Sequence, residues 1–505
     1  MAVGIQNGLH QSSVTTGLFS RSSVKDYVIV LSGFGIVIAL HYLFLGNASF
    51  GFGPGGPPGG GLPPQLPGGN PQLQPPGTFG SYWPIWEMLT IPTIGEATLA
   101  LSVLLVISLA VAAVYRHTHG SMSFPMVALV GVIAIVLTNL IHGWYTGFVT
   151  PIGGALELLV DLPKVISPID FISRYASLQP TLSVHASTQP PGAVLTIYFL
   201  SLLFGSADMI ALGLAVIAGL GSAFFIRGIF TKLFDSETAK YAVLLYLLLP
   251  AVQVYYLANI YAIVATIAFG TLYFYLHTNR AISYVGTTTC LFLGTFISFL
   301  FVSIPLMLLL YELLRFFHQG SISGMKESVL HFGVSLQKLI VIGVGLVLVY
   351  GLLWSVLGFN YISAFLYASS LENPNGFMLF SNPAQYISTR LENVMDILVF
   401  FGPVLVALSY RGFQYLRADA DETGGGFRKR LLVIAALVAL GLLFLTGAPK
   451  KGETARICVF ILPFLIIPAI EKIRRDGFSE RDKLLLLLIV FTQAVVIQLV
   501  GFYVW

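Results

Sequence analysis

The chain is a series of apolar runs, most of them long enough to cross a lipid bilayer, and this feature constrains its fold more than any other. A transmembrane helix needs about 20 consecutive, mainly apolar residues. Of the 505 residues, 56% are hydrophobic and only 10% are charged, whereas soluble domains carry about 25% charged residues. We therefore predict an all-α polytopic membrane protein with about 13 transmembrane helices. The predicted spans are 27–46, 95–115, 123–142, 207–226, 239–257, 259–277, 282–298, 299–317, 338–357, 393–411, 430–447, 455–471 and 483–503.

The distribution of lysine and arginine predicts the orientation of the chain, since cytoplasmic loops are enriched in both. With a cytoplasmic N-terminus, 20 of the 26 basic residues fall on the cytoplasmic side. We predict a multi-pass protein of the cell membrane, with a cytoplasmic tail at 1–26 and a single transmembrane domain at 27–505. No small-residue cleavage site follows the first apolar run, which is expected to be a retained helix. The basic residues on the outer face are Lys164, Arg174, Arg390, Lys450, Lys451 and Arg456.

Three long outer loops follow from this orientation, at residues 47–94, 143–206 and 358–392. The first is rich in glycine and proline, and its residues 51–77 are expected to be disordered or polyproline-like. Within the second loop, the apolar run 190–205 is predicted to be a short helix at the outer face or dipping into it. Counting this run as a span would move most of the basic residues outside, against the observed bias.

Several other kinds of site are not indicated by the sequence. Cys290 and Cys458 lie in apolar runs and are expected to be buried, without a disulfide or metal role. A formal net charge of +4 gives no reason to expect nucleic-acid binding. The spans hold few charges, whereas an ion relay places ionisable groups deep in the bilayer. No internal repeat of the kind common in transporters is evident.

The polar segment DLPKVISPIDFISRYASLQPTLSVHASTQPPG, at 161–192, is the strongest candidate for chemistry, because so polar a stretch in an apolar chain needs a functional reason. A carboxylate there can act as a general base toward an acceptor hydroxyl. An outer-face arginine can hold a phosphate through two parallel hydrogen bonds. The candidate catalytic residues are Asp161, Asp170 and His185, and the candidate substrate-binding residues are Gln189, Asn259, Lys450, Glu453 and Arg456.

Each of these residues also has a structural alternative. The aspartates are equally suited to cap short helices or to lie solvated in a loop. The histidine and the glutamine fit hydrogen bonds within the loop or at the entry of a helix, and the asparagine fits a hairpin turn. The arginine fits a side chain that extends toward lipid headgroups.

Three segments resemble the integral-membrane glycosyltransferases of the GT-C superfamily, particularly the protein O-mannosyltransferase and aminoarabinose-transferase-like branch. The first is the acidic outer loop followed by HASTQPPGAVLTIYFLSLLFG (185–205). The second is the hairpin LLYLLLPAVQVYYLANIYAIVATIAFGTLYFYL (244–276), and the third is GETARICVFILPFLIIPAI (452–470). The resemblance covers most of the chain and rests on these segments together with the predicted topology.

The chain departs from the family pattern at the loop that matters most. The His-Pro-Pro of the family is Gln189-Pro190-Pro191 here, and the nearest histidine is His185. Single aspartates replace the acidic pair that often opens the loop. The WWDYG signature of oligosaccharyltransferases is absent, which argues against transfer of a whole glycan to asparagine.

The resemblance implies an inverting transfer of one sugar from a polyprenyl-phosphate donor to a protein, glycan or lipid acceptor on the outer face. Asp161 or Asp170 would deprotonate the acceptor hydroxyl, and Arg456 would stabilise the leaving phosphate, helped by Lys450 or Lys451. A divalent metal is compatible with this reaction, although the sequence contains no ligand cluster that demands one. The alternatives are a lipid-linked saccharide flippase or transporter, and a non-catalytic membrane scaffold for envelope assembly.

Overall fold

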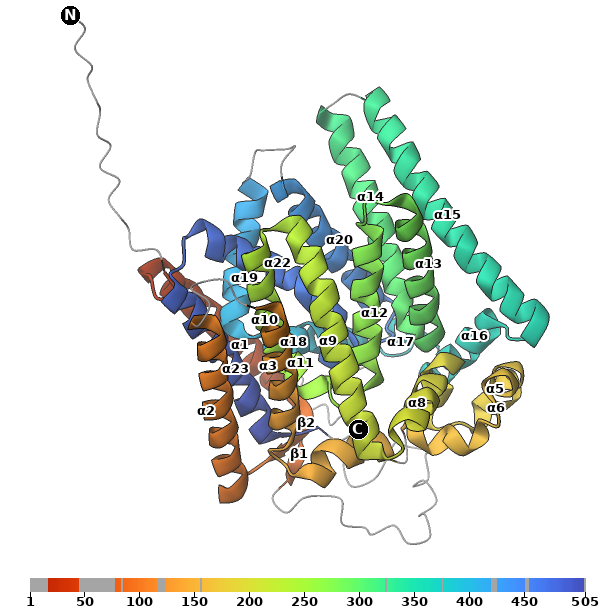
Figure 1. Cartoon of the computed structure of the whole chain (residues 1–505), viewed down its shortest axis with the longest axis horizontal. Coiled ribbons are helices and arrows are strands. Elements are labelled where there is room, and N and C mark those ends of the chain that lie inside the picture. The colour runs from red at the N-terminus through yellow and green to blue at the C-terminus, as the bar shows by residue number, and fades with distance from the viewer. Residues whose placement is uncertain are drawn as a thin grey trace, which may run out of the picture.

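The computed structural model of the chain describes residues 17–44, 78–82, 85–116, 123–154, 157–322, 325–374, 376–418, 425–449 and 454–503. Long helices run side by side through the height of the molecule, and shorter helices and strands gather at one end (Figure 1). Within the described residues, the predicted apolar spans fall mainly on helices, although the run 455–471 is divided among α21 (Thr454–Ile457), η5 (Val459–Ile461) and α22 (Leu462–Arg475) and the run 483–503 ends in β3 (Gly501–Phe502). The longer helices are α1 (Arg21–Phe44), α2 (Ile94–Arg116), α3 (Phe124–Asn139), α9 (Ala207–Leu233), α10 (Ser236–Leu247), α12 (Ile260–Tyr275), α13 (Arg280–Ile297), α14 (Ser303–Ile322), α15 (Met325–Leu357), α18 (Pro383–Phe401), α19 (Pro403–Ala418), α20 (Gly425–Leu445), α22 (Leu462–Arg475) and α23 (Glu480–Val500).

Five of the described helices are long and apolar enough to cross a bilayer, judged by length and composition. A bent pair, α18 and α19, makes six if it counts as one span. The chain is therefore a helical membrane protein, and the number of 13 spans stays a prediction. The five are Ile94–Arg116, Ala207–Leu233, Phe299–Phe317, Gly333–Leu357 and Glu480–Val500.

Two predicted spans are not single straight helices. The run 239–257 is interrupted between α10 and α11 (Pro250–Tyr255), because Pro250 has no N–H to continue the helix. The run 393–411 bends by 99° between α18 and α19. Gly402 takes a positive φ of 107° at this bend, and Pro403 starts the next helix.

A small antiparallel sheet adds to the helices, which the all-α prediction did not include. Its strands are β1 (Thr78–Tyr82), β2 (Ile85–Thr90) and β3 (Gly501–Phe502), in the order β1-β2-β3. Residue Leu89 pairs with Gly501, so the end of the predicted outer loop 47–94 lies beside the last turn of α23. These two segments therefore share one end of the molecule, as their predicted placement on one face requires.

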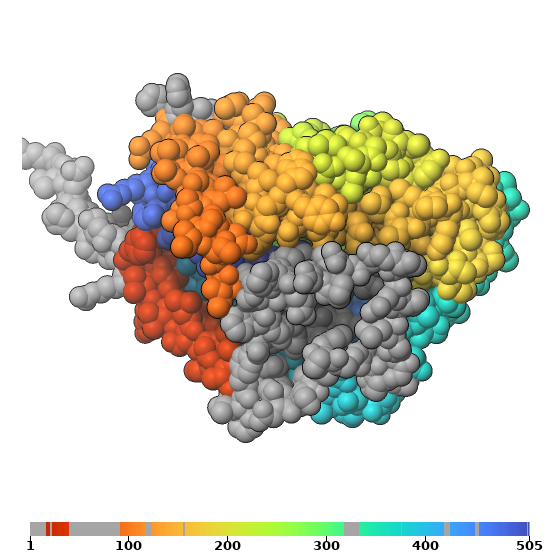
Figure 2. All heavy atoms as spheres, turned by 90° about the horizontal axis from the view of Figure 1, so that it is seen from below, coloured from red at the N-terminus to blue at the C-terminus, as the bar shows by residue number. Residues whose placement is uncertain are grey.

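The predicted outer loop 143–206 folds into short helices at the same end (Figure 1). Seen from that end, this orange-to-yellow part of the chain crosses most of the face (Figure 2). The predicted short helix at 190–205 is α8 (Pro191–Phe204), and Gly192 near its start packs against the backbone of Phe296 at the end of α13. The other short elements are the π-turn η1 (Tyr145–Val149), the 3₁₀ turns η2 (Leu158–Lys164), η3 (Gln179–Thr181), η4 (Phe299–Val302) and η5 (Val459–Ile461), and the helices α4 (Thr150–Gly153), α5 (Pro168–Ser173), α6 (Tyr175–Leu178), α7 (Val184–Ser187), α16 (Tyr361–Glu372), α17 (Met378–Ser381) and α21 (Thr454–Ile457).

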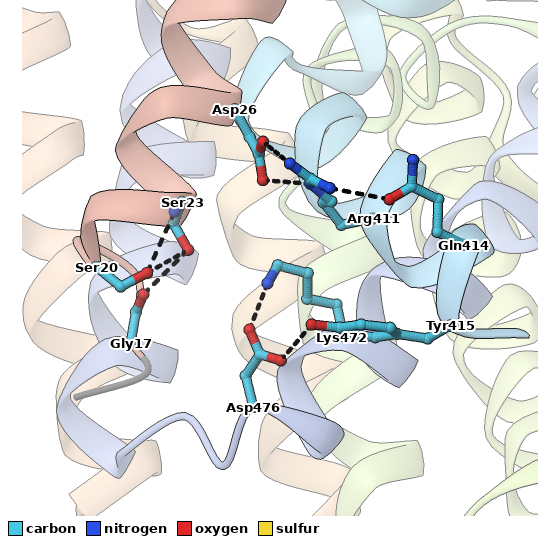
Figure 3. Close-up of polar contacts among 9 residues, drawn as sticks. All are labelled: Gly17, Ser20, Ser23, Asp26, Arg411, Gln414, Tyr415, Lys472 and Asp476. Carbon is cyan, nitrogen blue, oxygen red and sulfur yellow. Dashed lines mark hydrogen bonds and ion pairs between the residues drawn. The ribbon is translucent and has the colours of Figure 1, made fainter. Parts of the chain in front are cut away.

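Polar contacts fasten α1 to the rest of the helices (Figure 3). Both carboxylate oxygens of Asp26 accept hydrogen bonds from Arg411 on α19, each at 2.6 Å. This two-pronged geometry is the strongest that an arginine and a carboxylate form. Beside it, Asp476 accepts a hydrogen bond from the Tyr415 hydroxyl at 2.9 Å and pairs with Lys472. The cluster joins α1, α19 and the turn between α22 and α23.

The crossing of α19 and α22 depends on Gly412, because a Cβ there would lie 1.7 Å from the carbonyl oxygen of Pro468. We predict that Gly412→Ala lowers the unfolding free energy by more than about 2 kcal/mol, since the obstructing atom is backbone and cannot turn aside. Thermal unfolding in detergent measures the effect. Gly343→Ala on α15 is the matched control, because a Cβ there meets nothing within 4 Å. Equal losses in the two variants would contradict this account of the crossing.

Candidate functional site

A cavity of about 410 Å³ lies among the short helices at the end of the molecule shown in Figure 2. Its apolar wall comes from η4, α16 and the end of α20, with Phe299, Val302, Phe365 and Leu443 among its residues. Ligand pockets have volumes of about 300–1,000 Å³, with mostly apolar walls and a few placed polar groups. The polar and charged side chains of this cavity are Glu157, His185, Thr188, Gln189, Asn259, Tyr261, Ser369, Glu372, Asn373, Thr446 and Arg456.

The break between α10 and α11 lies just before the turn that reaches the cavity, and side chains bond its backbone. Gln253 donates from Nε2 to the Leu247 carbonyl at 2.5 Å and accepts at Oε1 from the Thr138 hydroxyl at 2.9 Å. Asn139 donates to the carbonyl of Gln253 at 2.7 Å. These bonds matter because unbonded backbone groups inside a bilayer cost several kcal/mol each. The broken helix is thereby held against α3, and the following turn is fixed.

That turn carries Asn259 to the cavity. Ala258 has a φ of +57°, the left-handed region that is costly for residues other than glycine. Asn259 then caps α12, accepting from the backbone N–H of Tyr261 at 2.9 Å. Because Oδ1 faces that N–H, the amide nitrogen Nδ2 must point the other way. The strained residue and the cap together fix the direction of the Asn259 amide.

Two buried amide atoms that line the cavity have no hydrogen-bond partner within the part of the chain that the structure describes. They are Nδ2 of Asn259 and Oε1 of Gln189. The other end of the Gln189 amide donates to the Tyr261 hydroxyl at 2.9 Å. A buried polar atom without a partner costs about 1–3 kcal/mol, so such atoms in a cavity wall indicate where a polar ligand binds.

A glutamate and a histidine meet at the cavity wall. Nδ1 of His185 lies 2.9 Å from Oε1 of Glu157, which directly precedes η2. His185 belongs to α7, whose cap is the Ser183 side chain accepting from Ala186 N–H. A carboxylate on Nδ1 selects the tautomer with the proton on that nitrogen and leaves Nε2 to accept a proton. The pair therefore has the arrangement of a general base and the group that orients it.

Tyr175 holds the segment between α7 and α8 in place. Its hydroxyl donates to the carbonyls of Gln189 and Ala186, across the turn that links α7 to α8. Burial raises the pKa of the Tyr175 phenol, with a smaller contribution from the nearby Asp161 carboxylate. The phenol is thus a fixed donor that locks the position of Gln189.

Arg456 supplies the buried cation of the cavity, where it is 5% exposed. Its guanidinium lies 5.8 Å from the centre of the Tyr261 ring. The short helix α21 that carries it is bonded to α18, since Asp396 accepts from the Ala455 N–H at 2.6 Å. Arg390 and Asn393 of α18 donate to the carbonyl of Pro449, at 2.7 and 3.0 Å.

The structure brings together four of the predicted site residues, His185, Gln189, Asn259 and Arg456, which all line the cavity. Two others, Lys450 and Glu453, lie outside the described residues.

The two aspartates predicted as the general base do not line the cavity. Asp161 is 1% exposed and accepts from Lys164 at 2.8 Å and from the Ser183 N–H at 2.9 Å. Its bonds tie η2 to the start of α7. Asp170 lies on α5 and is paired with Arg174, whose hydrogen bonds lower the pKa of this carboxyl. Both carboxylates are thus engaged by neighbouring groups of the loop, outside the cavity.

Two carboxylates of the cavity, Glu157 and Glu372, are not among the predicted site residues. Glu157 stands four residues before Asp161 and belongs to the same outer loop, but it precedes the polar segment 161–192. Glu372 closes α16 within the predicted loop 358–392, where it follows a mainly apolar stretch. A carboxylate at the end of an apolar stretch on the predicted outer face is the sequence signal that indicates Glu372 as a site residue. Among the described residues, no group of three His, Cys, Asp or Glu side chains is placed to hold a metal ion.

No known family model matches the sequence, and no curated protein matches it. Among solved structures, the oligosaccharyltransferase of Archaeoglobus fulgidus, described in complex with zinc and sulfate, is similar with a TM-score of 0.38 and 11% identity. The match covers 74% of this chain and 53% of that protein, so the chain spans about half its length. A similarity this low carries neither a fold nor a function.

The different surroundings of the two aspartates predict different effects on stability. We expect Asp161→Ala to lower the unfolding free energy by about 2–4 kcal/mol, because the half-buried Lys164 ammonium and the Ser183 backbone N–H both lose a buried acceptor. Asp170→Ala is the matched control and is expected to leave the unfolding midpoint unchanged, since an exposed ion pair contributes little. Thermal unfolding of both variants in detergent tests the contrast. A midpoint for Asp161→Ala equal to that of the control would show that Asp161 is not the tie between η2 and α7.

Proposed function

We propose that this protein is a membrane glycosyltransferase that moves a single sugar from a lipid-phosphate donor to an acceptor hydroxyl at the outer membrane face. The observation that supports it is one cavity that combines an oriented imidazole, a buried guanidinium and an apolar wall. Transfer of a phosphate-linked sugar requires a base for the acceptor and a cation for the leaving phosphate. The apolar wall suits the part of the donor that stays in the lipid.

In this proposal His185 is the general base and Glu157 orients it. Nε2 of His185 takes the proton of the acceptor hydroxyl as its oxygen bonds to the anomeric carbon. The bond from that carbon to the donor phosphate breaks, and the phosphate leaves on the lipid with the bonding electron pair. Glu157 keeps the proton on Nδ1 and stabilises the imidazolium that forms. The resemblance to the GT-C superfamily supports inversion at the anomeric carbon.

Arg456 is the group that we assign to the donor phosphate. Guanidinium groups match phosphate oxygens with two parallel hydrogen bonds, and burial strengthens such contacts. Its helix is fixed by Asp396, so the cation is held in place before the substrate binds. Gln189 and Asn259 would bind the sugar hydroxyls through their unpartnered Oε1 and Nδ2 atoms. Lys450 stays a candidate to assist Arg456, and Glu453 a candidate to contact the substrate.

The donor class is a polyprenyl-phosphate sugar, and the acceptor is a protein, glycan or lipid hydroxyl. The resemblance to the protein O-mannosyltransferase and aminoarabinose-transferase-like branch supports this donor. The similarity to an oligosaccharyltransferase is too low to support transfer of a whole glycan, and the missing WWDYG signature argues against it.

The proposal predicts which carboxylate and which imidazole are required for turnover. Purified protein in liposomes would be given radiolabelled polyprenyl-phosphate mannose, glucose or arabinose, and the released sugar would be measured. We expect His185→Asn to reduce turnover by about 100-fold or more, because a positioned general base contributes that much. Glu157→Gln is expected to reduce turnover by at least about 10-fold, since the orienting charge is lost while the shape stays. Asp170→Asn is the matched control and should retain the turnover of the unmodified protein.

Two results would contradict this assignment. Loss of turnover in Asp170→Asn, with His185→Asn active, would show that the general base is Asp170 and not His185. Absence of release from all three donors, when a known transferase works in the same liposomes, would favour a flippase or transporter. Movement of the labelled donor across the vesicle bilayer would then be the decisive measurement.

A further inference from the structure

A second, much smaller space lies directly behind Asn259. This chamber has a volume of about 20 Å³, and Asn139, His142, Asn259, Gln498 and Tyr503 are among its lining residues. Asn259 and Pro151 line both the chamber and the main cavity. The chamber, which we call the Gln498 chamber, therefore joins the end of α23 to a residue of the proposed substrate site.

The Gln498 chamber holds one buried donor and one buried acceptor without partners within the described part of the chain. The donor is Nδ2 of Asn259, whose direction is fixed because Oδ1 caps α12. The acceptor is Oε1 of Gln498, a residue that is 4% exposed. A buried water needs about 10–15 Å³ of such space and two to four polar partners. The volume and the two complementary atoms meet both conditions for one water molecule.

The backbone of Gln498 is held in position by His142, another residue of the chamber wall. Nδ1 of His142 lies 2.8 Å from the Glu96 carboxylate. Nε2 lies 2.7 Å from the Gln498 carbonyl oxygen and 3.0 Å from that of Gly501. The ring therefore lies between the Glu96 carboxylate and two backbone carbonyls. This contact fastens the last turn of α23 to α2 and to the residues that follow α3. Gln498 therefore faces the chamber from a fixed backbone.

We propose that the Gln498 chamber binds one water molecule, which donates to Oε1 of Gln498 and accepts from Nδ2 of Asn259. Through this water, Gln498 is a positioning residue for the Asn259 amide. The chamber and its water stand on geometry alone, whereas the effect on turnover rests on the proposed function. The consequence is that a residue near the C-terminal end of the chain adds a second support, beside the α12 cap, to an amide whose other N–H faces the sugar.

The first test is a high-resolution experimental structure of the full chain. We expect a water peak within about 3.2 Å of both Nδ2 of Asn259 and Oε1 of Gln498. In Gln498→Met, which keeps the length of the side chain but removes the acceptor, the peak should disappear. An empty chamber in the unmodified protein, at a resolution where other buried waters are seen, would overturn the water site whatever the activity of the protein.

The second test is a double-mutant cycle of Gln498→Met and Asn259→Ala, read by unfolding midpoint and by release of sugar from the polyprenyl-phosphate donor. If Gln498 acts through Asn259, Gln498→Met should lower turnover by about five-fold alone and have no further effect in Asn259→Ala. Gln498→Glu, which keeps an acceptor, should restore most of the loss.

Gln493 lies on α23, the same helix as Gln498, and its side chain donates to the Val399 carbonyl of α18. Gln493→Met removes this bond and is the matched control for the cycle. Its effects should add to those of Asn259→Ala. Additive effects of Gln498→Met would overturn the positioning role. If the unmodified protein releases no sugar, the proposed function fails, and the water peak and the unfolding cycle still decide this inference.

Discussion

The structure depends on a requirement of the bilayer, that every backbone N–H and C=O inside it finds a partner. A continuous helix meets this requirement by itself, but a helix broken by Pro250 does not. Gln253 bonds the Leu247 carbonyl at the end of α10, and Asn139 of α3 bonds the Gln253 carbonyl on α11. The Thr138 hydroxyl donates to the Gln253 side chain and adds a second bond between α3 and α11. Asn259 stands on the turn that follows α11 and reaches the cavity from there.

The same requirement explains why unpartnered atoms are informative here. Around the break and on α18, buried polar side chains are used to hold backbone, as Asp396 holds α21 and Arg390 holds Pro449. At the cavity wall, in contrast, Gln189 and Asn259 each use one end of the amide for the fold and present the other end to the space. Because an unused buried donor or acceptor carries a cost, this division of each amide is best explained by a ligand.

Much of the helix pattern was predictable, since apolar length and basic residues are local signals that the bilayer imposes. The breaks were not placed, because Pro250 and Pro403 break a helix only where other residues compensate the lost bonds. Of the predicted site residues, Gln189 beside a proline turn and Asn259 at a helix start line the cavity. The two aspartates do not line it, because a sequence gives acidity but not partners. Asp161 is saturated by Lys164 and Ser183, whereas Glu157, four residues earlier in the same loop, faces His185.

The bend between α18 and α19 connects these observations. A straight helix through Gly402 would continue along one axis, but α18 and α19 meet at 99°. Arg390, Asn393 and Asp396 are spaced three residues apart, so they lie on one side of α18. The first two reach Pro449, which follows α20, and the third reaches Ala455 in α21. The cation of the cavity is therefore supported by a helix that contributes no side chain to the cavity wall. Substitutions on α18 should consequently act on Arg456 through geometry rather than through contact with substrate.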